Sequence, residues 1–177
     1  MKLNKLIAIA TISLLSGGIS MAQKALNLED IVAGNVIQTK GVGSMTWLKD
    51  GERYSRLENN KQTGGTDIVA YQAKDNSREV IIPSSLLTDK STGKPIPVRS
   101  ISWSADNEKV LIYNNTQRVW RYDTRGNYWV LNLKDGALRQ LGKGMPESSM
   151  MFAKFSPDGT RVAYVSNCLL YTSDAAD

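Results

Sequence analysis

Short apolar runs, rich in β-branched and aromatic residues, alternate along this chain with clusters of turn-forming residues. The stretch from Phe152 to Val165 shows this pattern most clearly. Its centre, 156–159 (Ser-Pro-Asp-Gly), suits a type I turn, because proline presets φ at the second position and glycine favours the fourth. The run 160–165 has apolar residues on both faces, which is typical of a strand in a sheet covered on both sides. The pattern predicts a strand, a tight turn and a second strand.

The same unit recurs twice upstream. Residues 45–54 carry Asp-Gly at the turn, and residues 101–113 carry Asp-Asn, in which the asparagine tolerates positive φ better than most residues. The turn aspartates stand at 50, 106 and 158, at intervals of 56 and 52 residues. A repeat of this length, with an aromatic residue before each turn, is typical of propeller blades. We therefore expect an all-β fold, an incomplete β-propeller of about two and a half four-stranded antiparallel blades.

Each blade needs four short strands in sequence. In the first blade, which begins near residue 43, strands are expected at 44–48, 52–57, 66–71 and 78–82. In the second blade they are expected at 99–103, 108–113, 127–133 and 137–141. The third blade is expected to begin at Met150.

Two connections differ from short hairpin turns. Residues 83–97 contain three prolines and a glycine, and we expect an exposed, mobile link between blades. Residues 114–126 form a connection that is long for a hairpin and that holds Trp120 and Arg121. Long loops on a rigid repeat scaffold often carry binding groups.

Residues 1–22 have the features of a secretory signal peptide, expected as a helix before the blades. Lys2 and Lys5 form the charged region, 6–15 is apolar, and Ala22 ends a small-x-small cleavage site. The apolar stretch is short for a bilayer, so no stable membrane span is expected after signal cleavage. Residues 23–42 are expected to form a leader with a short helix over 26–33. The signal predicts export to a periplasm or the cell exterior; a buried N-terminal helix is the alternative.

The composition excludes several kinds of chemistry. The sequence contains no histidine, which removes a Ser-His-Asp triad, a Cys-His pair and histidine metal ligation. Its single cysteine forms neither an internal disulfide nor a cysteine-based zinc site. The formal net charge of +5 is scattered, which argues against nucleic acid as a partner. We expect no catalytic residue, metal site or cofactor in this chain.

The last ten residues, 168–177, stand apart from the blade pattern. The codons TGT-CTC-TTA-TAC-ACA-TCT-GAC-GCT-GCC-GAC encode them, and the peptide resembles the translated read-through of a transposon-type sequencing adaptor. We expect 168–177 to be a non-native tail that follows a partial propeller over 43–167. The alternative is that 169–171 begins the third strand of the third blade, which the pattern also accepts. Genomic sequencing through codon 177 distinguishes the two.

Equivalent residues recur once per blade. Trp47, Trp103 and Phe155 each precede a turn, and this regular placement favours a role in the blade core. The aspartates at 50, 106 and 158 have side chains that can bind metals, but one aspartate per blade favours turn chemistry.

Three stretches together resemble the N-terminal propeller of dipeptidyl peptidase IV-type enzymes, in the prolyl oligopeptidase clan of serine peptidases. They are the opening blade at 45–54, the Trp-Arg loop and following strand at 119–133, and the Phe-Ser-Pro-Asp-Gly stretch at 155–165, which Asn167 follows. The resemblance extends over residues 38–167.

The resemblance implies that the chain is the substrate-gating front portion of an exported serine exopeptidase. In that family an α/β-hydrolase domain follows the propeller and releases dipeptides from free peptide N-termini, with Pro or Ala preferred at the second position. The family's catalytic residues, and the paired glutamates that hold the substrate's amino group, have no counterpart in this sequence. The chain alone is expected to be inactive. The implied partners are a peptide substrate and the hydrolase domain, and a homodimer is compatible with them.

Arg121 matches the family's arginine in the Trp-Arg loop, which faces the active-site cavity and contacts a substrate carbonyl. A guanidinium suits that role because it stays charged and offers several fixed donors. Trp120, beside it, is a second candidate for substrate contact. The alternative is that Arg121 pairs with Asp123 or stacks on Trp120 in a solvated loop.

Two other functions fit the repeat pattern. One is an exported propeller that only binds, such as a TolB-like periplasmic module, and the other is a different branch of the clan, such as an oligopeptidase or acylaminoacyl peptidase. The Trp-Arg loop favours the dipeptidyl peptidase. Downstream DNA distinguishes the classes, because a Gly-x-Ser-x-Gly elbow followed by Asp and His indicates a peptidase, whereas a stop codon after the propeller indicates a binder.

Overall fold

The computed structural model describes residues 27–28, 32, 41 and 43–175, and the chain divides into two units, 1–41 and 42–177. The predicted signal peptide lies outside the described residues. Leu28 and Val32 are helical, at positions where the sequence predicts the leader helix. In the described ranges, no helix is both long and apolar enough to cross a membrane.

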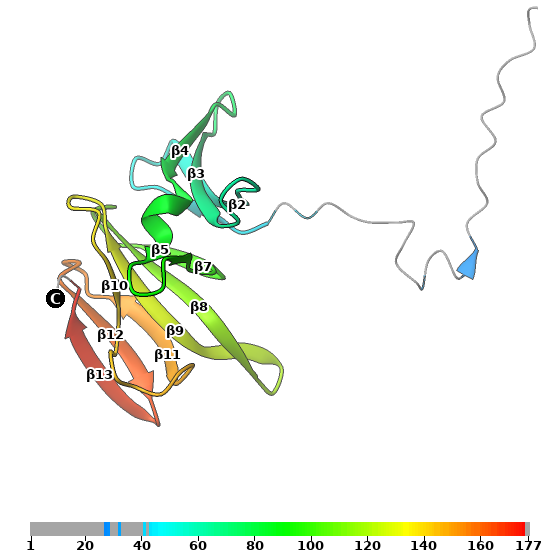
Figure 1. Ribbon diagram of the computed structural model, residues 1–177. Coiled ribbons are helices and arrows are strands. Elements are labelled where there is room, and N and C mark those ends of the chain that lie inside the picture. Colours follow the sequence, from blue (N-terminus) through cyan, green and yellow to red (C-terminus); the bar gives the residue numbers. More distant parts are fainter. Residues whose placement is uncertain (1–26, 29–31, 33–40, 42, 176–177) are drawn as a thin grey trace, which may run out of the picture. The chain divides into compact units, whose positions relative to one another are not determined.

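The first blade is a four-stranded antiparallel sheet with strand order β1-β2-β3-β4 (Figure 1). β2 and β3 pair without interruption along their whole length. All four predicted strands of this blade are confirmed, each to within two residues. The strands are β1 (Met45–Trp47), β2 (Arg53–Asn59), β3 (Thr66–Gln72) and β4 (Arg78–Ile82).

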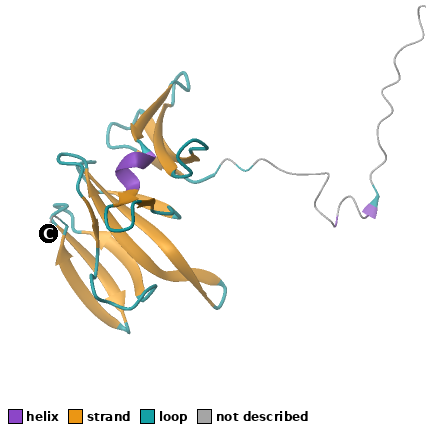
Figure 2. Cartoon of the chain, viewed as in Figure 1, coloured by secondary structure: helices purple, strands orange, loops and turns teal. Residues whose placement is uncertain are grey.

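The second and third blades share one sheet, of order β13-β12-β11-β9-β8-β7, in which β10 also pairs with β9. Within the backbone pairing of this sheet, the two blades are joined at a single residue pair, Met150↔Gly126. The second blade contains β7 (Ser100–Trp103), β8 (Lys109–Val119), β9 (Tyr122–Asn132) and β10 (Leu138–Gln140). The third contains β11 (Met150–Phe155), β12 (Arg161–Ser166) and β13 (Leu169–Asp174). Two four-stranded blades and three strands of another confirm the expected all-β, incomplete propeller (Figure 2).

β13 occupies most of the segment 168–177. It pairs with β12 along its full length, from Arg161↔Asp174 to Ser166↔Leu169. β13 is therefore the third strand of the third blade, as the alternative interpretation of residues 169–171 expects. The adaptor origin of these residues stays a prediction for sequencing.

The prediction of a loop over 114–126 is wrong. β8 and β9 instead continue through this segment as a two-stranded ribbon that ends at the pair Val119↔Tyr122. Figure 2 shows the ribbon projecting beyond the neighbouring strands. Register shifts on both sides of Gln117 interrupt the pairing locally, and such irregularities increase twist without ending a hairpin. The segment's polar residues are typical of a loop, but backbone pairing, not an apolar face, holds a projecting ribbon together.

Most residues of the link over 83–97 are exposed, as predicted, but the link also contains short regular elements and buried apolar side chains. These residues form the 3-10 helix η1 (Ser84–Leu87) and the short hairpin β5 (Thr88–Asp89) and β6 (Lys94–Pro95). Leu87 and Ile96 are buried in the core beside the first blade. The backbone N–H of Ser84 donates to the Asp67 carboxylate at 2.7 Å. Two apolar side chains among polar neighbours thus fix the connection against the sheet.

The core lies on both faces of the second blade. Consecutive residues of a strand point to opposite faces, and β8 uses this alternation. Val110 and Ile112 pack in one cluster with Ile68 and Ile82 of the first blade. Leu111, between them, packs in a second cluster with residues of the third blade, which include Met150, Val162 and Tyr164. Burial of each such aliphatic side chain stabilises the fold by about 1.5–3 kcal/mol.

The turn aspartates confirm the predicted turn chemistry. Oδ1 of Asp50, Asp106 and Asp158 each accepts the backbone N–H two residues later, at 2.9–3.0 Å. In the second and third blades a serine hydroxyl, of Ser104 or Ser156, donates to the same oxygen at 2.5 Å. These serine hydroxyls are the main reason why the pKa of Asp106 and of Asp158 is lowered to about 2.

The aromatic residues before the turns have different surroundings in each blade. Trp103 packs against the core, and its Nε1–H donates to Oγ of buried Ser55 in the first blade at 2.9 Å. Phe155 packs against the cluster between the second and third blades. The prediction that Trp47 is a core residue is wrong, because this side chain is 60% exposed. Trp103 and Phe155 each pack against the preceding blade. Among the described residues, none forms a blade that precedes the first one and could cover Trp47.

Acid should weaken the turns of the second and third blades. A carboxyl whose pKa is depressed by folding stabilises the protein above its unfolded pKa, and this contribution is lost as the pH falls through the folded pKa. For Asp106 and Asp158 that window runs from the ordinary 3.8 to about 2. We expect the Tm of the protein to fall through this window, and to fall less steeply in the double variant Asp106→Asn, Asp158→Asn. Differential scanning fluorimetry across the window measures both slopes; identical slopes would contradict the assignment.

The Trp103→Phe variant tests the bond between the first two blades. It keeps an aromatic ring in the core but removes the donor to Ser55, whose hydroxyl still bonds the Thr46 carbonyl at 3.1 Å, together with part of the packed ring. We expect a loss of at least about 0.5–1.5 kcal/mol in the free energy of unfolding, to which the lost packing adds, measured in urea. Trp120→Phe is the matched control, since Trp120 is 95% exposed and should leave stability unchanged. Equal stability of the two variants would show that the bond contributes nothing.

Candidate functional site

The tip of the β8–β9 ribbon places Trp120 and Arg121 in solvent. The pair Val119↔Tyr122 closes a two-residue turn, and Trp120 has φ of 62°. Positive φ at the first central position of such a turn normally requires glycine. A bulky residue held there costs on the order of 1–3 kcal/mol. A strained, exposed tryptophan beside an arginine makes this tip a candidate functional element.

Tyr113 holds the base of the ribbon. Its hydroxyl lies 2.9 Å from the carbonyl oxygens of both Asp123 and Arg125, on the opposite strand. Its ring stacks on Tyr128 with centroids 4.8 Å apart. The ring passes so close to Gly126 that a Cβ there would lie 2.4 Å from it, which only glycine avoids. A tyrosine hydroxyl is protonated at physiological pH even with its ordinary pKa, and burial raises the pKa of Tyr113 further, to about 12.

An ion pair joins the ribbon to the start of the second blade. Arg99 donates to the Asp123 carboxylate at 3.3 Å, and the Arg99 backbone N–H donates to the Tyr113 carbonyl at 2.8 Å. Both side chains are partly exposed, so the ion pair itself contributes at most about 1 kcal/mol. Its main consequence is that the Asp123 carboxylate is already engaged.

An open polar cavity of about 690 Å³ lies beside the ribbon. The tip residue Arg121 lines it, and so does Asp123, which Arg99 engages. Within residues 43–175, no ion pair joins Arg121 to a carboxylate. The sequence left open a pairing of Arg121 with Asp123, but in the structure Asp123 pairs with Arg99 instead. The lining residues are Ser44, Arg99, Ser100, Tyr113, Arg118, Arg121, Tyr122 and Asp123.

A second cavity, of about 460 Å³, lies between the first and second blades. Half of the residues that line it are apolar, among them Leu48, Ile81 and Leu133, and the polar half includes Lys49 and the ion pair between Arg53 and Asp50 at 2.7 Å. These groups belong to the packing between blades. The polar cavity beside the ribbon is the better candidate site, because it brings together two guanidinium groups, of Arg118 and Arg121, that have no carboxylate partner among residues 43–175.

Sequence reasoning identified only part of this site. Trp120 and Arg121, which the sequence predicted in a long loop, lie at the tip of the β8–β9 ribbon, and their contact with a substrate stays a prediction. Arg99, Tyr113 and Arg118 were missed. Arg118 shares the segment with Arg121 and could have been considered, whereas Arg99 comes from a different strand and reaches the site only through folding. Among the described residues, no group of three or more His, Cys, Asp or Glu side chains could hold a metal ion.

Comparisons with known proteins find similar sequences and a similar fold. Residues 104–177 match the family model of the dipeptidyl peptidase IV (DPP IV) N-terminal region. A probable dipeptidyl-aminopeptidase B of Aspergillus oryzae is 25% identical over 123 residues, which cover 69% of this chain and 13% of the relative. Dipeptidyl aminopeptidase B of Saccharomyces cerevisiae is 26% identical over 155 residues, which cover 82% of this chain and 17% of the relative. The chain thus spans less than a fifth of the length of these relatives.

A solved structure shares the fold. The crystal structure of Porphyromonas gingivalis dipeptidyl peptidase 4 superposes with a TM-score of 0.66 at 19% sequence identity, and the match covers 87% of this chain and 21% of that one. The agreement supports the order of blades described above.

The Tyr113→Phe variant tests how the ribbon is held. It keeps the stacking on Tyr128 but removes the hydroxyl that bonds the carbonyls of Asp123 and Arg125. We expect faster backbone hydrogen exchange in 118–125, by about 3- to 10-fold, since a bond of about 0.5–1.5 kcal/mol is lost. Exchange in β12 serves as the internal control and should not change. Unaltered exchange in the ribbon would mean that Tyr113 does not hold it.

Proposed function

Because this chain carries a propeller portion of the dipeptidyl peptidase IV N-terminal type, we propose that it is the substrate-gating part of an exported serine exopeptidase that releases X-Pro and X-Ala dipeptides from peptide N-termini. The position of Arg121 carries the proposal. This arginine stands at the tip of a ribbon, lines a polar cavity and has no carboxylate partner among residues 43–175.

In this proposal Arg121 binds a carbonyl oxygen of the substrate. A guanidinium remains charged at every physiological pH and presents its donors in a fixed plane, so it fixes the orientation of a peptide group as well as its position. The ribbon base, held by Tyr113 and by the Arg99–Asp123 pair, keeps the tip in place. Binding energy from such a contact aligns the scissile bond with groups that lie elsewhere.

The bond-breaking groups belong to another part of the protein. The 177-residue sequence contains no histidine, so it cannot itself supply the base of a Ser-His-Asp triad. We assign the catalytic triad to an α/β-hydrolase domain of a longer polypeptide, which would be the main partner of this propeller. A peptide is the second partner, a homodimer is compatible with the arrangement, and nucleic acid and cofactors have no role in the proposal.

Export is part of the same proposal. The two N-terminal lysines, the apolar run and the small residues that end at Ala22 have the order of a cleavable signal. The mature protein would then act in a periplasm or outside the cell.

Substitution of Arg121 in the complete polypeptide tests the proposal. Arg121→Ala removes a charge-assisted hydrogen bond, worth about 1.5–3 kcal/mol, and should lower kcat/KM on an X-Pro substrate by about 10- to 100-fold. Arg121→Lys keeps the charge but not the planar fork, so its loss should be intermediate. Steady-state release of a chromophore from X-Pro conjugates measures the effect.

Lys61→Ala is the control, since Lys61 lies in the turn between β2 and β3, away from the lining of the cavity. Unchanged kinetics in Arg121→Ala would reject the role of Arg121. No release of dipeptides by the wild-type polypeptide would reject the proposed activity itself.

A further inference from the structure

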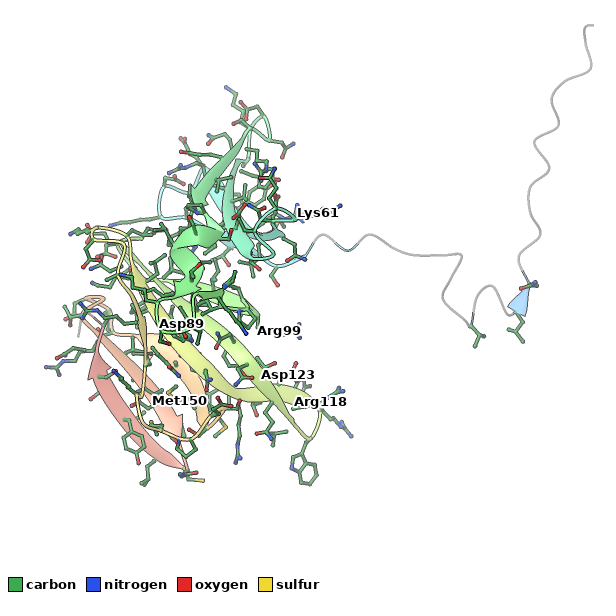
Figure 3. The ribbon with its side chains drawn as sticks, viewed as in Figure 1. Lys61, Asp89, Arg99, Arg118, Asp123 and Met150 are labelled. Atoms are coloured by element: carbon green, nitrogen blue, oxygen red, sulfur yellow. The ribbon has the colours of Figure 1, made fainter. Side chains whose placement is uncertain are left out.

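Arg118 is a second cation of the same site. It lies on β8 directly opposite Asp123 and lines the cavity beside Arg121. Its Nη2 donates to the backbone carbonyl oxygen of Arg121 at 3.4 Å, which places its head group at the tip turn. Figure 3 shows Arg118 and Asp123 on the ribbon and Arg99 beyond Asp123, at the start of the second blade.

The charges that line the cavity do not balance. Three guanidinium groups, of Arg99, Arg118 and Arg121, face a single carboxylate, that of Asp123. Arg99 engages this carboxylate at 3.3 Å. Within residues 43–175, neither Arg118 nor Arg121 forms an ion pair with a carboxylate. Two like charges side by side attract an anion, because it relieves their repulsion.

The donors of Arg118 are largely free for a ligand. A guanidinium carries five N–H donors, and the Arg121 carbonyl oxygen accepts from one nitrogen only, at the long distance of 3.4 Å. The remaining edge can hold a carboxylate through two parallel hydrogen bonds, the strongest geometry for this pair. A neutral side chain would gain far less from the same position.

The release of a dipeptide determines which substrate residue lies here. The carbonyl of the second residue is the one that the nucleophile attacks, so the carbonyl that Arg121 binds belongs to the first residue. The side chain of the first residue is attached to the carbon next to that carbonyl. It would therefore enter the cavity that Arg121 lines, and Arg118 lines the same cavity.

We infer that Arg118 is a specificity-determining residue that selects peptides with an acidic first residue, through an ion pair with its carboxylate. This inference rests on the proposed function of Arg121 and adds a substrate class to it. Arg121 recognises a group that every peptide has, whereas Arg118 distinguishes among peptides.

The test compares two substrates that differ only in charge, Glu-Pro and Gln-Pro conjugates of the same chromophore, on the complete polypeptide. We expect the wild type to have a kcat/KM about tenfold higher for Glu-Pro, and this ratio to fall with added salt. Arg118→Gln should bring the ratio to about one, because it should lower the Glu-Pro value far more than the Gln-Pro value. Arg121→Gln should lower both values by a similar factor, and Lys61→Gln should change neither.

A binding measurement keeps the inference testable if no dipeptide is released. Calorimetric titration with the free dipeptides Glu-Pro and Gln-Pro should show tighter binding of Glu-Pro to the wild type and equal binding to Arg118→Gln. That result without turnover would reject the proposed activity but support Arg118 as the binding site for an acidic first residue. A preference for Glu-Pro that persists in Arg118→Gln, or no preference in the wild type by either measurement, would overturn the inference. Arg118 is exposed, so the unfolding curve of Arg118→Gln should match the wild type and confirm that it folds.

Discussion

The burial of β8 on both of its faces is the constraint on which the rest of this structure depends. Val110, Leu111 and Ile112 are consecutive and at most 2% exposed, yet they belong to two different clusters. A strand sends neighbouring side chains to opposite faces, so these three residues can be buried together only if a blade packs on each side. The second blade therefore packs against the first blade on one face and against the third on the other.

The same strand changes its surroundings along its length. From Val110 to Ile112 it is apolar on both faces, Asn114 is still buried, and from Asn115 the strand is mainly polar and leaves the core as half of a ribbon. Tyr113 stands at the transition, with its ring on Tyr128 and its hydroxyl on the carbonyls of β9. The buried half fixes where the ribbon starts, and Tyr113 fixes the direction in which it leaves. A guanidinium at the tip is thus held by the core through two bonded strands, not by a loose loop.

The features of the fold that depend on local chemistry could be predicted from the sequence. The turn aspartates and the β-branched runs predicted the strands of the first blade to within two residues, because both act over a few positions. The ribbon was missed because residues 114–126 lack an apolar face, the signal from which a strand is recognised. The exposure of Trp47 was missed for a different reason, since three equivalent positions suggested equal burial, whereas burial depends on which blade lies next to each one. Within the site, Arg121 could be found from its motif, but the Arg99–Asp123 pair joins residues 24 positions apart and exists only in the folded chain.

A determined structure of the complete polypeptide tests the central claim that these repeats are successive blades, each of which turns its aromatic residue toward the blade before it. The claim predicts that Trp47, 60% exposed here, is covered by a further blade in the same manner in which Trp103 is placed against Ser55. A complete structure in which Trp47 stays equally exposed, or in which the residues of β8 are not enclosed between two sheets, would contradict it.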